Sequence, residues 1–108
     1  MDIKSNERDG VIILEVHGEI NINTSPDLKK HFEKQAKKKI VVDLREVTYV
    51  DSSGLATLVE MLKKTKVQGG SLGLASMPEK IKSLFEITKL DKLFSVFQNQ
   101  QDAVTRIK

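Results

Sequence analysis

The sequence predicts an α/β fold built on a mixed, largely parallel sheet. Short apolar runs typical of strands alternate with helical patterns after an initial hairpin, which gives the order β-β-α-β-α-β-α-β-α. Such alternation is typical of parallel strands joined by right-handed crossover helices. A length of 108 residues is close to the common size of one domain, so residues 1–108 are expected to form a single domain.

The first two strands are predicted to form a hairpin. The run VIILEV at 11–16 is apolar and rich in β-branched residues, as strands are. Residues 2–8 can pair with it across Asp9-Gly10, because Asp-Gly suits a two-residue turn in which both positions adopt positive φ.

A helix is predicted over residues 24–38, with Ser25 as the N-cap and Pro26 at the first helical position. Its inner face is marked by residues four apart: Leu28, Phe32 and Ala36. The next run, 39–47, is continuously apolar over its first half and predicts a strand buried on both faces.

The second half of the chain repeats the alternation. A helix ending near Gly69-Gly70 is indicated by apolar residues at i, i+3, i+4 and i+7: Leu55, Leu58, Val59 and Leu62. A strand at 71–76 follows, and Ser76 with Glu79 forms a capping-box pattern that would open a helix. The inner face of that helix is expected to carry Ile81, Leu84 and Phe85. A strand at 93–97 and a closing helix at 102–108 complete the order.

Composition excludes several functions. The chain contains no cysteine, so disulfides, thiolate metal sites and cysteine nucleophiles are excluded. Neither a signal peptide nor a membrane span is visible, so a cytoplasmic protein without a membrane partner is expected. The lysine run at 37–39 has no aromatic neighbours and predicts a solvated helix end rather than a nucleic-acid site. His31 has no metal-ligand partner at helical spacing, and no metal or other cofactor is expected.

The stretch DSSG at 51–54 concentrates polar chemistry between two apolar runs. A helix that starts at Ser52 or Ser53 leaves backbone N–H groups unpaired, which Asp51 or Ser52 can cap. Gly54 permits close approach by a neighbouring strand or by a partner. One cap needs one residue, so three successive capping residues and a glycine favour a function beyond capping.

Catalysis does not suit this stretch. The serines lack the G-x-S-x-G elbow, and the two histidines lie in the first hairpin and first helix with no third group evident. Phosphate loops of the forms G-x-x-x-x-G-K-[ST] and G-x-G-x-x-G are absent as well. The chain is therefore not expected to be an enzyme, and a hydroxyl at an exposed helix start is instead a good site for regulatory phosphorylation.

The segments VVDLREVTYVDSSGLATLV and GEININTSPDL resemble the STAS domain of bacterial anti-sigma factor antagonists, whose signature is D-S-[ST]-G-L. The resemblance covers essentially the whole chain and implies the STAS fold, with the helices mainly on one face of the sheet. It also implies a partner-switching cycle. The antagonist binds an anti-sigma factor that is a serine protein kinase, sigma factor is released, phosphorylation ends the binding, and a phosphatase resets it.

The resemblance implies that Ser52 accepts the phosphate. It places the following residues in the partner-binding surface: Asn21, Ile22, Asn23, Thr24, Asp51, Ser53, Gly54 and Leu55, with Thr57 and Met61 on the exposed face of the next helix. Met61 lies three residues from Leu58 and could equally face the core. Asn21 stands where the family usually has Asp, which bears on kinase contact and on the rate of phosphorylation.

Two alternatives stay open at this stage. One is a STAS domain that binds or scaffolds partners without being phosphorylated, and the other is a STAS domain that senses a small molecule or nucleotide. Nothing in the sequence demands self-association, so a monomer is expected when the chain is free.

Overall fold

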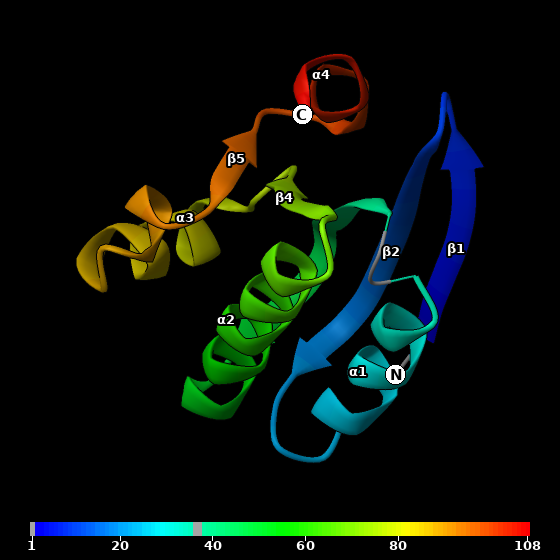
Figure 1. Ribbon diagram of the computed structural model, residues 1–108. Coiled ribbons are helices and arrows are strands. Elements are labelled where there is room, and N and C mark those ends of the chain that lie inside the picture. Colours follow the sequence, from blue (N-terminus) through cyan, green and yellow to red (C-terminus); the bar gives the residue numbers. More distant parts are fainter. Residues whose placement is uncertain (1, 36–37) are drawn as a thin grey trace.

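The computed structural model of the protein describes residues 2–35 and 38–108, and its five strands form one sheet in the order β1-β2-β3-β4-β5 (Figure 1). The strands are β1 (Asp2–Arg8), β2 (Val11–Ile20), β3 (Lys39–Val50), β4 (Ser71–Ala75) and β5 (Ser95–Phe97). The helices are α1 (Ser25–Glu33), α2 (Ser52–Val67), α3 (Glu79–Ile87) and α4 (Gln100–Arg106), with a 3-10 turn, η1, at Leu90–Lys92. β1 is antiparallel to β2 and the other neighbours are parallel, which confirms the predicted mixed sheet and element order.

The opening hairpin is confirmed, including its turn. Asp9 and Gly10 both have positive φ, at 52° and 79°, as a type I′ turn requires. β2 continues to Ile20, well beyond the run predicted from the sequence, because it stays paired with β3 as far as Val50. This longer pairing places the carboxyl ends of β2 and β3 side by side.

Three helices cover one face of the sheet and α4 covers the other (Figure 1). The larger core joins the sheet to α1, α2 and α3 through Leu28, Phe32, Leu58, Met61, Ile81 and Phe85. The smaller core lies beneath α4 and contains Val11, Ile13, Val41, Ala75, Ala103, Val104 and Ile107. The predicted placement of the helices mainly on one face is therefore confirmed. The predicted burial of β3 on both faces holds only for residues 40–44, because its second half contains exposed residues.

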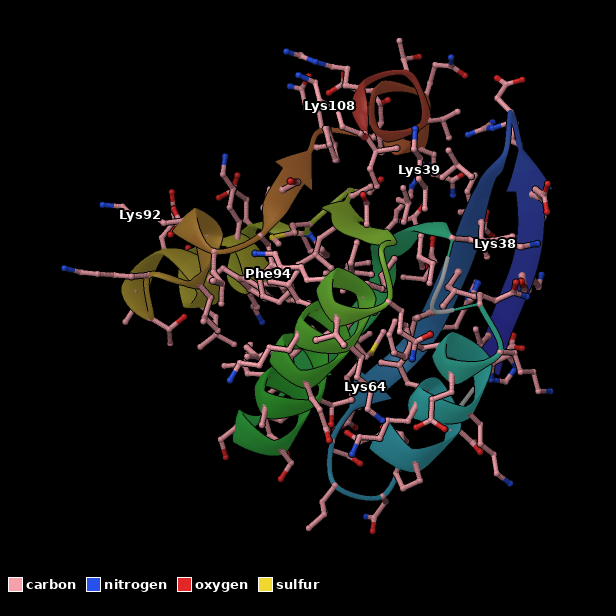
Figure 2. The ribbon with its side chains drawn as sticks, viewed as in Figure 1. Lys38, Lys39, Lys64, Lys92, Phe94 and Lys108 are labelled. Atoms are coloured by element: carbon pink, nitrogen blue, oxygen red, sulfur yellow. The ribbon has the colours of Figure 1, made fainter. Side chains whose placement is uncertain are left out.

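Two ion pairs link α1 to α2 on the outer side of the larger core. Lys29 Nζ lies 2.6 Å from Glu60 Oε2, and Lys64 Nζ lies 3.2 Å from Glu33 Oε1 (Figure 2 labels Lys64). The hydrogen bond from Lys29 holds the pKa of the Glu60 carboxyl below its usual value. Both pairs are solvent-exposed, so each contributes little to the stability of the fold.

The start of α1 differs from its prediction. Thr24 is the N-cap residue, whereas Ser25 is the first helical residue and is buried, with no hydrogen-bond partner for its Oγ within the described chain. Ser25 as N-cap was therefore wrong, although Pro26 does occupy the first turn. α1 ends at Glu33, and Ala36 of the predicted inner face lies outside the described residues.

The capping box predicted at Ser76 and Glu79 was also wrong. Ser76 has a left-handed backbone with φ of 60°, and its N–H donates to the carbonyl oxygen of Phe97 at 3.2 Å. A tertiary bond to β5 thus replaces the local one, and the cap residue of α3 is Pro78. β5 is shorter than predicted because the N–H groups of Leu93 and Phe94 donate to the carbonyl oxygen of Leu90, in the turn that ends η1. α4 begins at Gln100, two residues before the predicted start, because Asn99 Oδ1 accepts the N–H of Asp102 at 2.8 Å.

Phe85 of α3 is the best place to test the larger core. It is fully buried and meets Phe94 edge to face, with ring centroids 5.8 Å apart (Figure 2 labels Phe94). Phe85→Ala should lower the free energy of unfolding by about 3–5 kcal/mol, measured by urea denaturation, because it leaves a cavity. Ile87→Ala, on the exposed end of the same helix, should change it by no more than about 0.5 kcal/mol. Equal losses in the two variants would contradict this assignment of the core.

Candidate functional site

The candidate site lies where the parallel strands β2 and β3 end side by side. Ile20 pairs with Val50 at the last position of the register, and the N–H of Asp51 donates to the carbonyl oxygen of Ile20 at 3.2 Å. The chain after β2 forms the loop 21–24, and the chain after β3 enters α2 directly. Because the carboxyl ends of parallel strands meet at one edge, the two polar segments predicted from the sequence lie next to each other.

Asp51 caps α2. Its Oδ1 accepts the N–H of Gly54 at 2.8 Å, and its carbonyl oxygen accepts the N–H of Leu55 at 2.9 Å. The helix begins at Ser52, which is exposed, and the cap therefore needs nothing from the Ser52 hydroxyl. The sequence allowed either Asp51 or Ser52 to cap the helix. In the structure Asp51 is the capping residue, and the Ser52 side chain is not used for capping.

Gly54 fixes the helix start against the sheet. A Cβ at this position would overlap the carbonyl oxygen of Ile20 and would lie 2.9 Å from both Ile20 Cγ2 and Val50 Cγ1. These distances are far below van der Waals contact, so only glycine fits. The close approach predicted for Gly54 is confirmed, and it is made to the ends of β2 and β3.

The loop 21–24 is held by its own side chains. Asn21 Oδ1 accepts the N–H groups of Asn23 at 2.9 Å and Thr24 at 3.1 Å. Thr24 Oγ1 accepts the N–H of Asn21 at 2.9 Å and donates to the carbonyl oxygen of Glu19 at 2.8 Å. The loop uses position 21 as a hydrogen-bond acceptor, which both Asn and Asp provide. An Asp at position 21, which the family resemblance implies as the usual residue, could accept the same two N–H groups and would add a negative charge.

The predicted surface residues divide by exposure. Ile22, Asn23 and Ser52 are exposed, with Ile22 at 69%. Half-buried around them are Asn21, Thr24, Asp51, Ser53 and Leu55. Gly54 is buried beneath them and sets their position without being accessible itself.

Thr57 and Met61 are buried, at 6% and 1% exposure, so their predicted place on the exposed face of the helix was wrong. Met61 follows Leu58 by three residues, and neighbours at this spacing share one helix face. Because Leu58 faces the sheet, Met61 joins the larger core, which was the alternative left open for it. Thr57 lies four residues before Met61, so it lies on the same buried face of α2.

A groove of about 520 Å³ beside Ser52 was not predicted. It lies between the start of α2 and α3, and its walls include Tyr49, Ser52, Leu55, Lys80, Ile81 and Leu84. Tyr49 is 55% exposed although it belongs to β3. Tyrosine is enriched in binding surfaces, so the single Tyr beside the DSSG stretch was the one signal available in the sequence.

Other site types are not supported in the part of the chain that the structure describes. Residues 2–35 and 38–108 contain no group of three His, Asp or Glu side chains arranged to hold a metal ion. His31 Nδ1 lies 2.9 Å from the carbonyl oxygen of Asp27, a bond within its own helix. Among the described helices, none combines the length and the apolar character needed to cross a bilayer.

Comparison with known proteins agrees with this geometry. The family model of the STAS domain matches residues 2–103, so the chain belongs to the STAS domain family. It is 33% identical to an anti-sigma-B factor antagonist of Bacillus subtilis, over 96% of this chain and 95% of that protein. An anti-sigma-B factor antagonist of Listeria monocytogenes is 35% identical, over 89% of this chain and 86% of the relative.

The fold is shared with solved structures as well. The crystal structure of an anti-sigma factor antagonist from Mycobacterium paratuberculosis superposes with a TM-score of 0.88 at 27% identity. The superposition covers 98% of this chain and 92% of that one. The resemblance stated from the D-S-[ST]-G-L signature is thus confirmed at the level of family and fold.

Gly54→Ala tests whether the site depends on the contact with β2 and β3. The added methyl must displace backbone atoms of Ile20, so the free energy of unfolding should fall by about 1–3 kcal/mol or more. Ser53→Ala, one residue earlier in the same turn, should stay within about 0.5 kcal/mol. Thermal or urea denaturation measures both, and an unchanged Gly54→Ala variant would contradict the close approach.

Proposed function

We propose that this chain is an anti-sigma factor antagonist that binds an anti-sigma factor of the serine kinase class and is released when Ser52 is phosphorylated. Two observations support the proposal: the identity of 33–35% to proteins named anti-sigma-B factor antagonists, and the exposed serine directly after the capping Asp51. The exposed Ser52 carries the mechanism, because a kinase must reach the hydroxyl.

The site can accept a phosphate without refolding. Asp51 supplies the cap and Gly54 sets the helix against the sheet, so neither task falls on Ser52. The added charge of about −1.5 to −2 sits at the positive end of the α2 dipole, where it is tolerated. The chain needs no base of its own for this step, because the kinase supplies the catalytic groups. We therefore assign it a binding role and not an enzymatic one.

The proposed partner surface combines apolar and polar groups around Ser52. Ile22, just after β2, and Tyr49, near the end of β3, are exposed large hydrophobic residues, and Leu55 is partly accessible in the groove. Asn21, Asn23, Thr24, Asp51 and Ser53 surround them with hydrogen-bonding groups. A dianion on Ser52 would oppose docking of an acidic or apolar partner, and removal of the phosphate by a phosphatase would restore it. Such a regulator would act in the cytoplasm, as a monomer when free.

Phosphorylation is tested with the anti-sigma factor kinase of the same genome and ATP. Intact-mass measurement should show one added phosphate on the wild type and on Ser53→Ala, and none on Ser52→Ala. Ser52→Asp should weaken binding to that kinase by about tenfold or more in titration calorimetry, because a charge must be desolvated at the interface. Ser5→Asp, which adds the same charge at an exposed position on β1 outside the proposed surface, is the matched control and should leave binding unchanged.

The outcome separates the alternatives. Tight binding by wild type and Ser52→Asp alike, with no phosphate added, would favour a scaffold module that is not switched. No binding to any anti-sigma factor, with a raised melting temperature in the presence of a nucleotide, would favour a sensor of small molecules. Either result would contradict the proposed cycle.

Asn21→Asp restores the carboxylate usual in the family. Because Asn21 acts in its loop through an acceptor oxygen, the change should alter the free energy of unfolding by no more than about 0.5 kcal/mol. Asn21→Ala removes both hydrogen bonds and should cost about 1–2 kcal/mol. The rate of Ser52 phosphorylation should differ between wild type and Asn21→Asp, measured by timed intact-mass analysis. Equal rates would show that charge at position 21 does not govern kinase contact.

A further inference from the structure

Lys80 lies in the first turn of α3 and lines the same groove as Ser52. The other groove residues on the two helices are largely apolar, and they include Leu55, Ile81 and Leu84. Asp51 and Lys80 are the two charged residues of the groove. A phosphate on Ser52 would therefore enter a groove that contains one carboxylate and one ammonium.

Asp51 and Lys80 differ in whether they can bind a phosphate on Ser52. Asp51 Oδ1 already accepts the N–H of Gly54, and its negative charge would repel a phosphate one residue away. Lys80 takes part in none of the ion pairs formed by residues 2–35 and 38–108. Its ammonium, on a flexible stem with three donors, can turn toward a new anion without breaking an existing pair.

We propose that Lys80 is the counter-ion of the phosphate on Ser52 and that this ion pair closes across the groove between α2 and α3. This ion pair presupposes the proposed phosphorylation of Ser52, and it explains how the added negative charge would be balanced. The N⁺–H···O⁻ bonds would offset the repulsion from Asp51. They would also cover the apolar wall formed by Leu55 and Leu84, so phosphorylation would remove apolar docking surface as well as add charge.

The second pKa of the phosphoserine reports this pair directly. An opposite charge nearby lowers the pKa of an acid, and a phosphoserine ordinarily has its second pKa at about 6. Phosphoserine can be inserted at position 52 during translation of the full chain, and the pKa followed by ³¹P NMR titration. Lys80→Gln should raise the pKa by roughly 0.2–0.7, the range that partly exposed ion pairs produce. Lys80→Arg should keep it close to the value with lysine.

Lys82→Gln is the matched control. It removes the same charge from the same helix, but Lys82 is exposed and lines a separate cavity with Met77, Val96 and Phe97. It should leave the phosphoserine pKa unchanged. Equal shifts in Lys80→Gln and Lys82→Gln, or no shift in either, would overturn the proposed pair.

This experiment does not depend on a kinase. Failure of the kinase to modify Ser52 would contradict the proposed function and leave the ³¹P result intact. An unshifted pKa alongside normal enzymatic phosphorylation would overturn the role of Lys80 alone. Far-ultraviolet circular dichroism of each phosphorylated variant confirms that the fold is present, and Lys80 is an exposed residue whose replacement should not disturb it.

Discussion

The candidate site depends on the contact between Gly54 and the last residues of β2 and β3. The helix start lies so close to Ile20 and Val50 that a single methyl group would not fit. The backbone bond from Asp51 to Ile20 joins the two strand ends at the same point. Together these contacts determine where α2 leaves the sheet, and with it the direction in which Ser52 faces. The loop 21–24 begins one residue after Ile20, so the same contact also brings that loop beside the serine.

Each polar residue at this junction has a distinct task. Asp51 completes the helix, Gly54 brings it to the sheet, and Asn21 closes its own loop through two backbone N–H groups. Ser52 is left with no structural task in the described contacts. Three capping residues in a row looked redundant in the sequence, and the structure resolves that redundancy by giving the cap to one of them. The absence of a structural task for Ser52 within the described residues is the basis for the modification that we propose at this position.

Several local features were predictable from the sequence, although the N-caps of α1 and α4 were not, and features that depend on distant residues were missed. The Asp9-Gly10 turn and the helix at 52–67 follow from neighbouring residues, so both were predictable. Ser76 looked like a helix cap, but its N–H bonds to Phe97, which lies twenty-one residues away in sequence. The sequence allowed Met61 to face either solvent or the core. It faces the core because Leu58, on the same side of α2, packs against the sheet. The groove beside Ser52 joins residues 48–55 to residues 80–88, and no pattern within either segment reveals the other.

The separate roles of Asp51, Ser52 and Gly54 at the start of α2 have a consequence for the lifetimes of the unmodified protein and of the proposed phosphorylated form. Proteolysis in cells often acts on transiently opened chains, so it follows the equilibrium between folded and unfolded states. Because Ser52 supports neither the cap nor the core, the proposed phosphorylation would change that equilibrium little. Both forms would then persist for similar times, and the total amount of the protein would stay constant while its occupied fraction changes. Under the proposed cycle, phosphorylated copies would return to the binding form without new synthesis, so the enzymes that add and remove the phosphate would set the speed of the response.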